Sequence, residues 1–179
     1  MSNEVKVDGE NIKKSAEDLV ELIKLRTFPF GMKLFENVDD MLSIKGLRTP
    51  SDGKFFTTCQ LVTQVRTAGF TLGIVQNNLR PGSSCGANIG LEIVPEDVSS
   101  GQKMTGVWFG NQEAAAKHQA QMPRVEAGKY TGLAASPLRT RRLDPPDICL
   151  FYASPGQMIL FINGLQYHNY RPVSYTHLT

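Results

Sequence analysis

Residues 148–165 constrain the fold of this chain more than any other segment, because strand, turn and helix signals follow one another directly there. The apolar run 148–153 is typical of a strand. Ser154 is placed to cap a helix, Pro155 falls at the first helical position, and Gln157 comes three residues after the cap. Apolar residues then recur at helical spacing and predict a face turned toward the core: Met158, Ile159, Ile162 and Leu165.

Strand and helix patterns also alternate along the rest of the chain. Strands are predicted over residues 30–35, 71–75 and 130–135, and helices from residue 15 to before Pro29, over 38–42, over 59–68, and from Asn111 to Pro123. This order predicts an α/β (or α+β) fold with a mixed sheet flanked by helices. About eleven residues without a helix link the last two strands, which favours antiparallel pairing between them.

The length and the two termini predict the domain organisation. A chain of 179 residues is expected to form one domain. We expect residues 1–14 to be a flexible segment and residues 15–172 to be the single domain. The last residues, 173–179, break the preceding pattern and read like a translated sequencing adapter. We therefore expect these residues not to be native, and the true protein to continue beyond Pro172 with a different sequence.

Composition excludes several classes of protein. Nineteen basic and seventeen acidic side chains leave a formal charge of +2, which argues against a dedicated nucleic-acid or anionic-membrane surface. No apolar run approaches the roughly 20 residues that span a bilayer. The N-terminus lacks the apolar region of a secretory signal, so we expect a cytoplasmic protein. Its three cysteines are then expected to be free thiols or ligands.

Two of these cysteines stand in the same local setting. Thr57-Thr58 precedes Cys59, and Ser83-Ser84 precedes Cys85; such hydroxyl residues cap helix N-termini. A thiolate at that position is stabilised by the positive end of the helix dipole, which makes it a better nucleophile or metal ligand. The competing interpretation is that both thiols are small buried side chains at helix starts.

Five separated motifs together resemble a known family. They read FPFGMKLFE, TTCQLVTQVRTAGFTLG, SSCGANIGLE, YTGLAASPL and DPPDICLFYASPGQMILFINGLQY. In this order they resemble the prokaryotic domain-of-unknown-function family 169, over roughly residues 15–172. The resemblance implies a family abundant in anaerobic bacteria and archaea, without a settled activity, whose members carry a further C-terminal part that this chain lacks. The family pattern falls here on Cys59, Gln60, Arg66, Gly69, Cys85, Gly86, Gly90, Pro155 and Gln157.

The leading hypothesis is that Cys59 and Cys85 line one shared site for a metal ion, an iron–sulfur centre or a thiol-reactive ligand. Two thiolates alone do not complete a zinc or iron–sulfur site. In this hypothesis Arg66 and Lys33 offer positive charge to a bound anion. Gly86 allows close backbone approach, and Gln60 and Gln157 donate hydrogen bonds.

Two other classes remain open. The first is a non-catalytic module that binds a small anion through backbone N–H groups around Ser83–Gly90 and Ser154–Gln157. The second is a structural subunit of a larger complex. The phosphate-binding P-loop, GxGxxG, GxSxG, HExxH and CxxC signatures are all missing from the sequence, so neither a reaction nor a substrate is assigned, and the oligomeric state is left open.

Overall fold

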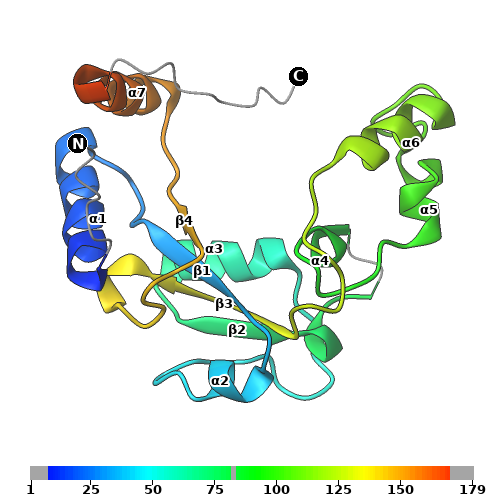
Figure 1. The fold of residues 1–179 in the computed structure, drawn as a ribbon, viewed down its shortest axis with the longest axis horizontal. Helices are drawn as coiled ribbons and strands as arrows, with labels where there is room; N and C mark the ends of the chain where they lie inside the picture. Colours follow the sequence, from blue (N-terminus) through cyan, green and yellow to red (C-terminus); the bar gives the residue numbers. More distant parts are fainter. Residues whose placement is uncertain (1–7, 82–83, 170–179) are drawn as a thin grey trace.

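The computed structural model describes residues 8–81 and 84–169, which form a four-stranded sheet covered and flanked by helices (Figure 1). The strands lie in the order β2-β3-β1-β4. Their bounds are Phe30–Phe35 for β1, Leu72–Val75 for β2, Gly132–Pro137 for β3 and Ile148–Leu150 for β4. The predicted class, α/β in a single domain, is confirmed.

The pairing of the strands corrects two details of the prediction. Each neighbouring pair of strands in the sheet is antiparallel, whereas a mixed sheet was expected. Parallel pairing occurs in isolated bridges outside the named strands, such as the bridge between Arg48 and Leu72. The strands β3 and β4 were expected to pair with each other, but β1 lies between them and pairs with both. Phe30, for example, faces Pro137 on one side and Leu150 on the other. A strand from the start of the chain therefore separates two strands from its end.

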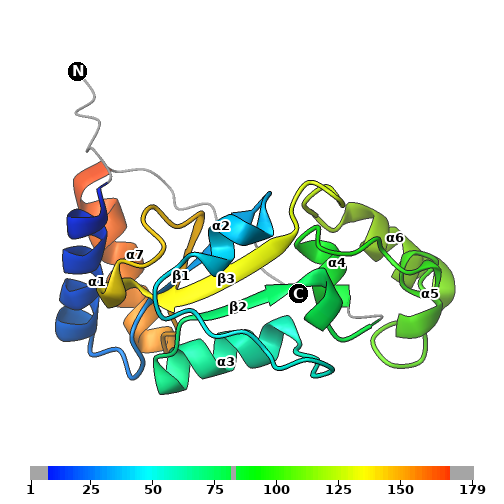
Figure 2. The same ribbon diagram turned by 90° about the horizontal axis from the view of Figure 1, so that it is seen from below.

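A helix covers each face of the sheet (Figure 2). The first is α3 (Thr58–Ala68), whose Leu61 and Val65 pack with one set of strand residues into the main apolar core. The second is α2 (Val38–Leu42), whose Met41 packs with Ala134 on the opposite face. Since side chains alternate along a strand, neighbouring residues of β1 and β3 contribute to different cores.

The remaining helices gather at the two ends of the sheet (Figures 1 and 2). At one end lie α1 (Gly9–Ile23) and α7 (Pro155–Asn169). At the other lie α4 (Ser84–Asn88), α5 (Glu96–Ser99) and α6 (Gln112–Gln121). Short 3₁₀ turns complete the described elements: η1 (Gln76–Asn78), η2 (Gln102–Met104) and η3 (Leu138–Thr140).

The helix α1 begins earlier than the sequence predicted. Asp8 caps it, because its carboxylate accepts a hydrogen bond of 2.8 Å from the backbone N–H of Asn11. Residues 9–14, expected to be flexible, are therefore helical. The expected non-native segment 173–179 and the first seven residues lie outside the described residues.

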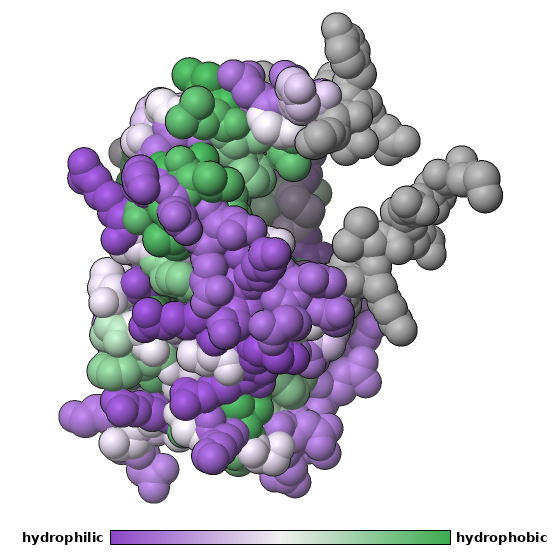
Figure 3. All heavy atoms as spheres, turned by 90° about the vertical axis from the view of Figure 1, so that its left-hand side faces the viewer, coloured by the Kyte–Doolittle hydropathy of each residue, from purple (hydrophilic) through white to green (hydrophobic). Residues whose placement is uncertain are grey.

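The helix α7 begins as predicted but does not bury its apolar stripe. The backbone N–H of Ser154 donates to Gln157 Oε1 at 2.8 Å, as the capping box requires. Met158, Ile159 and Leu165, however, are 39%, 59% and 46% exposed. The cause is position: α7 stands away from the sheet, beside α1 (Figure 1), and hydrophobic side chains gather on the surface where it lies (Figure 3). In the part of the chain that the structure describes, no helix combines the length and apolar character needed to cross a membrane.

Candidate functional site

The first predicted cysteine lies in the first turn of α3, where a capping box fixes the backbone. The N–H of Gln60 donates to Thr57 Oγ1 at 3.1 Å, and the N–H of Thr57 donates to Gln60 Oε1 at 2.9 Å. Cys59 is the second residue of the helix and is exposed. The predicted capping by Thr57 is confirmed, and the side chain of Gln60 is occupied in holding the helix start.

The second cysteine lies in α4, a helix of only five residues. Gly86 and Ala87, which follow Cys85, are buried, and Gly86 accepts a backbone hydrogen bond of 3.1 Å from Leu91. This bond ties the short helix to the segment after it. Cys85 is half-buried. Ser83, the expected cap, lies outside the described residues.

The two thiols meet although they are 26 positions apart in the chain. Burial is the main cause that raises the pKa of Cys85. The negative charge of Cys59 and a side-chain hydrogen bond between the two cysteines raise this pKa further, and a hydrogen bond from Ser84 opposes them. The side chains of Cys59 and Cys85 are therefore close enough to interact. That they line one functional site stays a prediction.

The same interaction corrects one part of the prediction. Both thiolates were expected to be stabilised by helix starts, yet the pKa of Cys85 is raised above its ordinary value of 9.0. Burial favours the neutral thiol, and α4 is too short to offset this with a large dipole. Since charge on Cys59 opposes ionisation of Cys85, the pair loses its second proton at a higher pH than its first.

A carboxyl group near this pair was not predicted from the sequence. Oε2 of Glu92 is buried and has no hydrogen-bond partner among the described residues, and burial raises the pKa of this carboxyl. A Cβ atom built on Gly86 would lie only 2.8 Å from that oxygen. Gly86 thus leaves room for the Glu92 carboxyl beside α4. Nothing in the sequence marks Glu92, because its burial depends on tertiary packing.

A shallow hollow of about 280 Å³ gives access to the exposed thiol. Its lining consists of Cys59, Gln60, Thr63 and Gln64, all from the outer side of α3. A metal ion or a small reagent can therefore reach Cys59 from solvent. Within the described residues, no group of three or more histidine, cysteine, aspartate or glutamate side chains is arranged to hold a metal ion, so the pair offers two ligands.

The structure places three of the predicted site residues elsewhere. Lys33 belongs to the face of the sheet that carries α2, and its Nζ donates to the carbonyl of Pro145 at 3.0 Å. Arg66 lies seven residues after Cys59, about 10 Å farther along α3. Its guanidinium stacks over the ring of Tyr152 at 4.1 Å.

Gln157 has a structural role far from the cysteines. Besides capping α7, its Nε2 donates to the carbonyls of Ile23 and Lys24 at 2.9 and 2.6 Å. These bonds join the start of α7 to the end of α1. The side chain is thus fully engaged within the fold, and no donor of Gln157 is directed at the cysteine pair.

The fold and the site define a single-domain α/β protein with an interacting pair of free thiols. The family model DUF169, described as uncharacterised ArCR, matches residues 18–178. The chain belongs to this family, which confirms the resemblance found in the five motifs. The matched range reaches into residues 173–179, whose non-native origin stays a prediction.

The other two comparisons gave no similar protein. Neither the search of curated proteins nor the search of solved structures returned a match to this chain.

Proposed function

We propose that this protein binds one soft metal ion through the thiolates of Cys59 and Cys85. The observation that supports the proposal is that two thiols from separate helices, α3 and α4, lie close enough for Cys59 to raise the pKa of Cys85. Packing alone does not need a cysteine at both positions, because Cys59 is exposed and fills no core space. Two thiols that already interact need little rearrangement to hold one ion.

The number of ligands favours a particular class of metal. Zinc and iron–sulfur centres normally take four protein ligands, or three with an exchangeable one. Soft thiolates bind Cu(I) as well as zinc and iron–sulfur clusters. Of these, Cu(I) accepts two sulfur ligands in a linear arrangement. The pair thus suits a two-coordinate soft ion without help from a third side chain.

Protonation of the pair makes this binding depend on pH. Both thiols must lose their protons to become ligands, so two protons leave for each ion bound. Burial and the charge on Cys59 raise the pKa of Cys85 and make its proton harder to remove. We therefore expect the apparent affinity to rise with pH, and a positive ion between the sulfurs to offset the repulsion between the two thiolates.

The alternative of an anion-binding module gains less support at the segments expected for it. At Ser154–Gln157 the helix start is capped internally, because Gln157 N donates to Ser154 Oγ at 3.4 Å and Ser154 N donates to Gln157 Oε1. Near Gly86, the buried carboxyl of Glu92 disfavours a second negative group. The thiol pair is the better supported of the two sites.

The test is a Cu(I) competition titration on protein kept free of oxygen. We expect the native protein and Cys149→Ser to bind one Cu(I) with equal affinity, because Cys149 lies on β4 and lines a different hollow, beside α1. Cys59→Ser and Cys85→Ser should each weaken binding at least tenfold, since a single thiolate remains. Parallel titrations with Zn(II) should show much weaker binding. Equal Cu(I) affinity in all four proteins would refute the proposal.

A further inference from the structure

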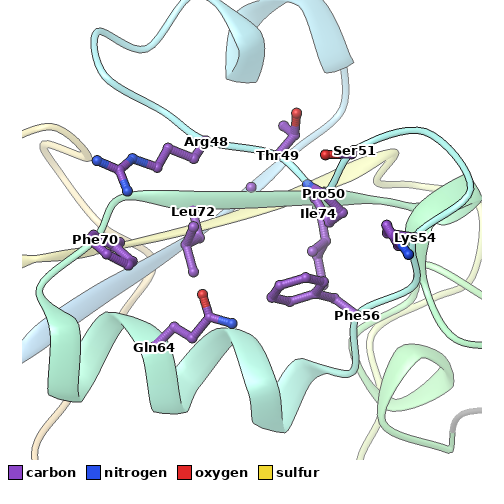
Figure 4. Close-up of a pocket in the computed structure, with 11 residues that line it drawn as sticks. Arg48, Thr49, Pro50, Ser51, Lys54, Phe56, Gln64, Phe70, Leu72 and Ile74 are labelled. Atoms are coloured by element: carbon purple, nitrogen blue, oxygen red, sulfur yellow. The ribbon is translucent and has the colours of Figure 1, made fainter.

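A separate cavity of about 280 Å³ lies between residues 48–56, the edge strand β2 and α3 (Figure 4). The side chain of Gln64 reaches toward the cavity from α3, and Phe56 and Leu72 also line it (Figure 4). Gln64 also lines the hollow at Cys59, so the two spaces are neighbours on α3. None of the residues predicted from the sequence as site residues lines this cavity.

The backbone itself creates the space. Residue 48 pairs with the edge of β2: Arg48 N donates to the carbonyl of Thr71 at 3.0 Å, and Gly73 N donates to the carbonyl of Arg48 at 2.9 Å. Pro50 has no N–H, so it cannot continue this ladder. The chain leaves β2 there and returns at Phe56, whose N–H donates to the carbonyl of Asn78 at 2.8 Å. The cavity occupies the gap between these two attachment points.

The base of the cavity is apolar and its rim is cationic. Phe56, Phe70, Leu72 and Ile74 form the base. Arg48 and Lys54 stand at the rim with the hydroxyl residues Thr49 and Ser51. The guanidinium of Arg48 lies 4.2 Å from the centre of the Phe70 ring, which holds it above the apolar base.

The charge of the rim is not balanced by acidic groups in the cavity. Among the described residues that line it, none is acidic, and the nearest aspartate in the sequence, Asp52, is exposed and does not line it. No ion pair joins Arg48 or Lys54 to a carboxylate in the described parts of the chain. Two cations above an apolar base favour a ligand with one anionic end and an apolar body.

We propose that this cavity binds a small organic anion, with its apolar body on Phe56, Phe70 and Leu72 and its carboxylate or phosphate at the rim that carries Arg48 and Lys54. The volume lies just below the usual range for drug-sized ligands, so the ligand is small, of the size of one aromatic ring with a short acidic arm. The site is independent of the metal-binding proposal, since neither cysteine of the pair lines it.

The experiment follows backbone amide signals of the full chain by NMR during titration. Phenylacetate and phenyl phosphate are the two probes, and benzyl alcohol is the neutral control with the same apolar body. We expect saturable shifts at Phe56, Phe70 and Ile74 with at least one of the two anions, and the tighter anion identifies the preferred acidic group. Benzyl alcohol should bind at least tenfold more weakly.

Matched variants assign the binding to the rim. Arg48→Gln and Lys54→Gln should each weaken anion binding roughly tenfold, because each removes one charged hydrogen-bond donor. Lys45→Gln, at an exposed lysine that does not line the cavity, should change it by less than about twofold. Cys59→Ser should leave it unchanged, which separates this proposal from the metal site. The proposal fails if neither anion gives saturable shifts at millimolar concentration, or if the rim variants bind as tightly as Lys45→Gln.

Discussion

At the scale of single residues, the thiol pair is asymmetric. Cys59 is exposed, whereas Cys85 is half-buried and its pKa is raised by burial, by the charge of Cys59 and by their shared hydrogen bond. The hydrogen bond from Ser84 acts in the opposite direction. Cys59 is thus the thiol that a reagent meets first, and ionisation of Cys85 is disfavoured.

This asymmetry predicts opposite effects for two substitutions. In a Cys149→Ser background, Cys59→Ser should move the midpoint pH of Cys85 alkylation downward, because two of the three causes that raise its pKa are removed. Ser84→Ala should move it upward, because the stabilising hydrogen bond is lost. The measurement is the rate of iodoacetamide alkylation of Cys85 against pH, read by mass spectrometry. An unchanged or upward-shifted midpoint in Cys59→Ser would show that the thiols do not interact, and an unchanged midpoint in Ser84→Ala would show that Ser84 does not stabilise the thiolate.

The carboxyl of Glu92 gives a prediction for stability. Burial raises its pKa above the ordinary value of 4.5, so the folded protein holds this proton more tightly than the unfolded chain does. This contribution to stability is complete below pH 4.5 and is lost as the pH rises through the raised pKa. Glu92→Gln removes the titration, so relative to the native protein it should gain stability as the pH rises.

Urea unfolding at one pH below 4.5 and at one near neutrality tests this prediction. The difference in free energy of unfolding between Glu92→Gln and the native protein should favour the variant more at the higher pH. Glu126→Gln, at an exposed glutamate, is the control. A variant that loses stability as the pH rises would show that Glu92 is needed as a carboxylate.

The sequence predicts local interactions of these residues, such as helix caps, better than it predicts which distant residues they contact. The caps at Thr57 and Ser154 were predicted because every participating group lies within three residues. The interaction between Cys59 and Cys85 was anticipated only from their similar settings. The positions of Lys33 and Glu92 were not predictable, because each depends on which face or segment the folded chain places beside it.

At the scale of secondary-structure elements, boundaries set by local signals were predicted closely. The strand β1 has the bounds expected, and α3 begins one residue earlier than expected and ends at Ala68 as predicted, followed by Gly69 at a φ of 70°. The pairing of β3 with β4 was wrong because β1, from a distant part of the sequence, lies between them. The residue pattern along the chain therefore predicts the bounds of a strand or helix better than it predicts which strand pairs with it.

The junction between α1 and α7 gives a prediction at this scale. Gln157→Ala removes the capping box of α7 and both bonds to the carbonyls of Ile23 and Lys24, so it should destabilise the protein by about 1–3 kcal/mol. Gln166→Ala, on the exposed surface of the same helix, should cost less than about 0.5 kcal/mol. The measurement is the free energy of unfolding of both variants in urea. Equal losses of stability in Gln157→Ala and Gln166→Ala would show that the junction contributes nothing.

At the scale of the whole molecule, apolar surface is concentrated on α7. Met158, Ile159, Leu160, Leu165 and Tyr167 are all exposed. Leu22 is also exposed and belongs to α1, which lies at the same end of the sheet as α7 (Figures 1 and 3). The helical periodicity in the sequence correctly indicates an apolar helix. It cannot indicate that this helix stands beside the sheet rather than on it, because that depends on the path of the connection after β4.

Substitutions on this apolar surface should change dye binding and self-association without changing the fold. Replacing Ile159 and Leu165 together with glutamine should lower the binding of an apolar-surface dye and reduce self-association in sedimentation measurements. Stability should change by less than about 1 kcal/mol, since neither side chain belongs to a core. A large loss of stability would instead show that these side chains are buried in solution.

The central claim is that Cys59 and Cys85 form one site, and a bridging reagent tests it most directly. Dibromobimane becomes fluorescent when one molecule alkylates two neighbouring thiols. In Cys149→Ser protein kept reduced, we expect a fluorescent product with one bridge, and peptide mapping should join the segments that contain Cys59 and Cys85. Cys59→Ser in the same background should give no fluorescence. Separate alkylation of Cys59 and Cys85, without a bridge between them, would contradict the account.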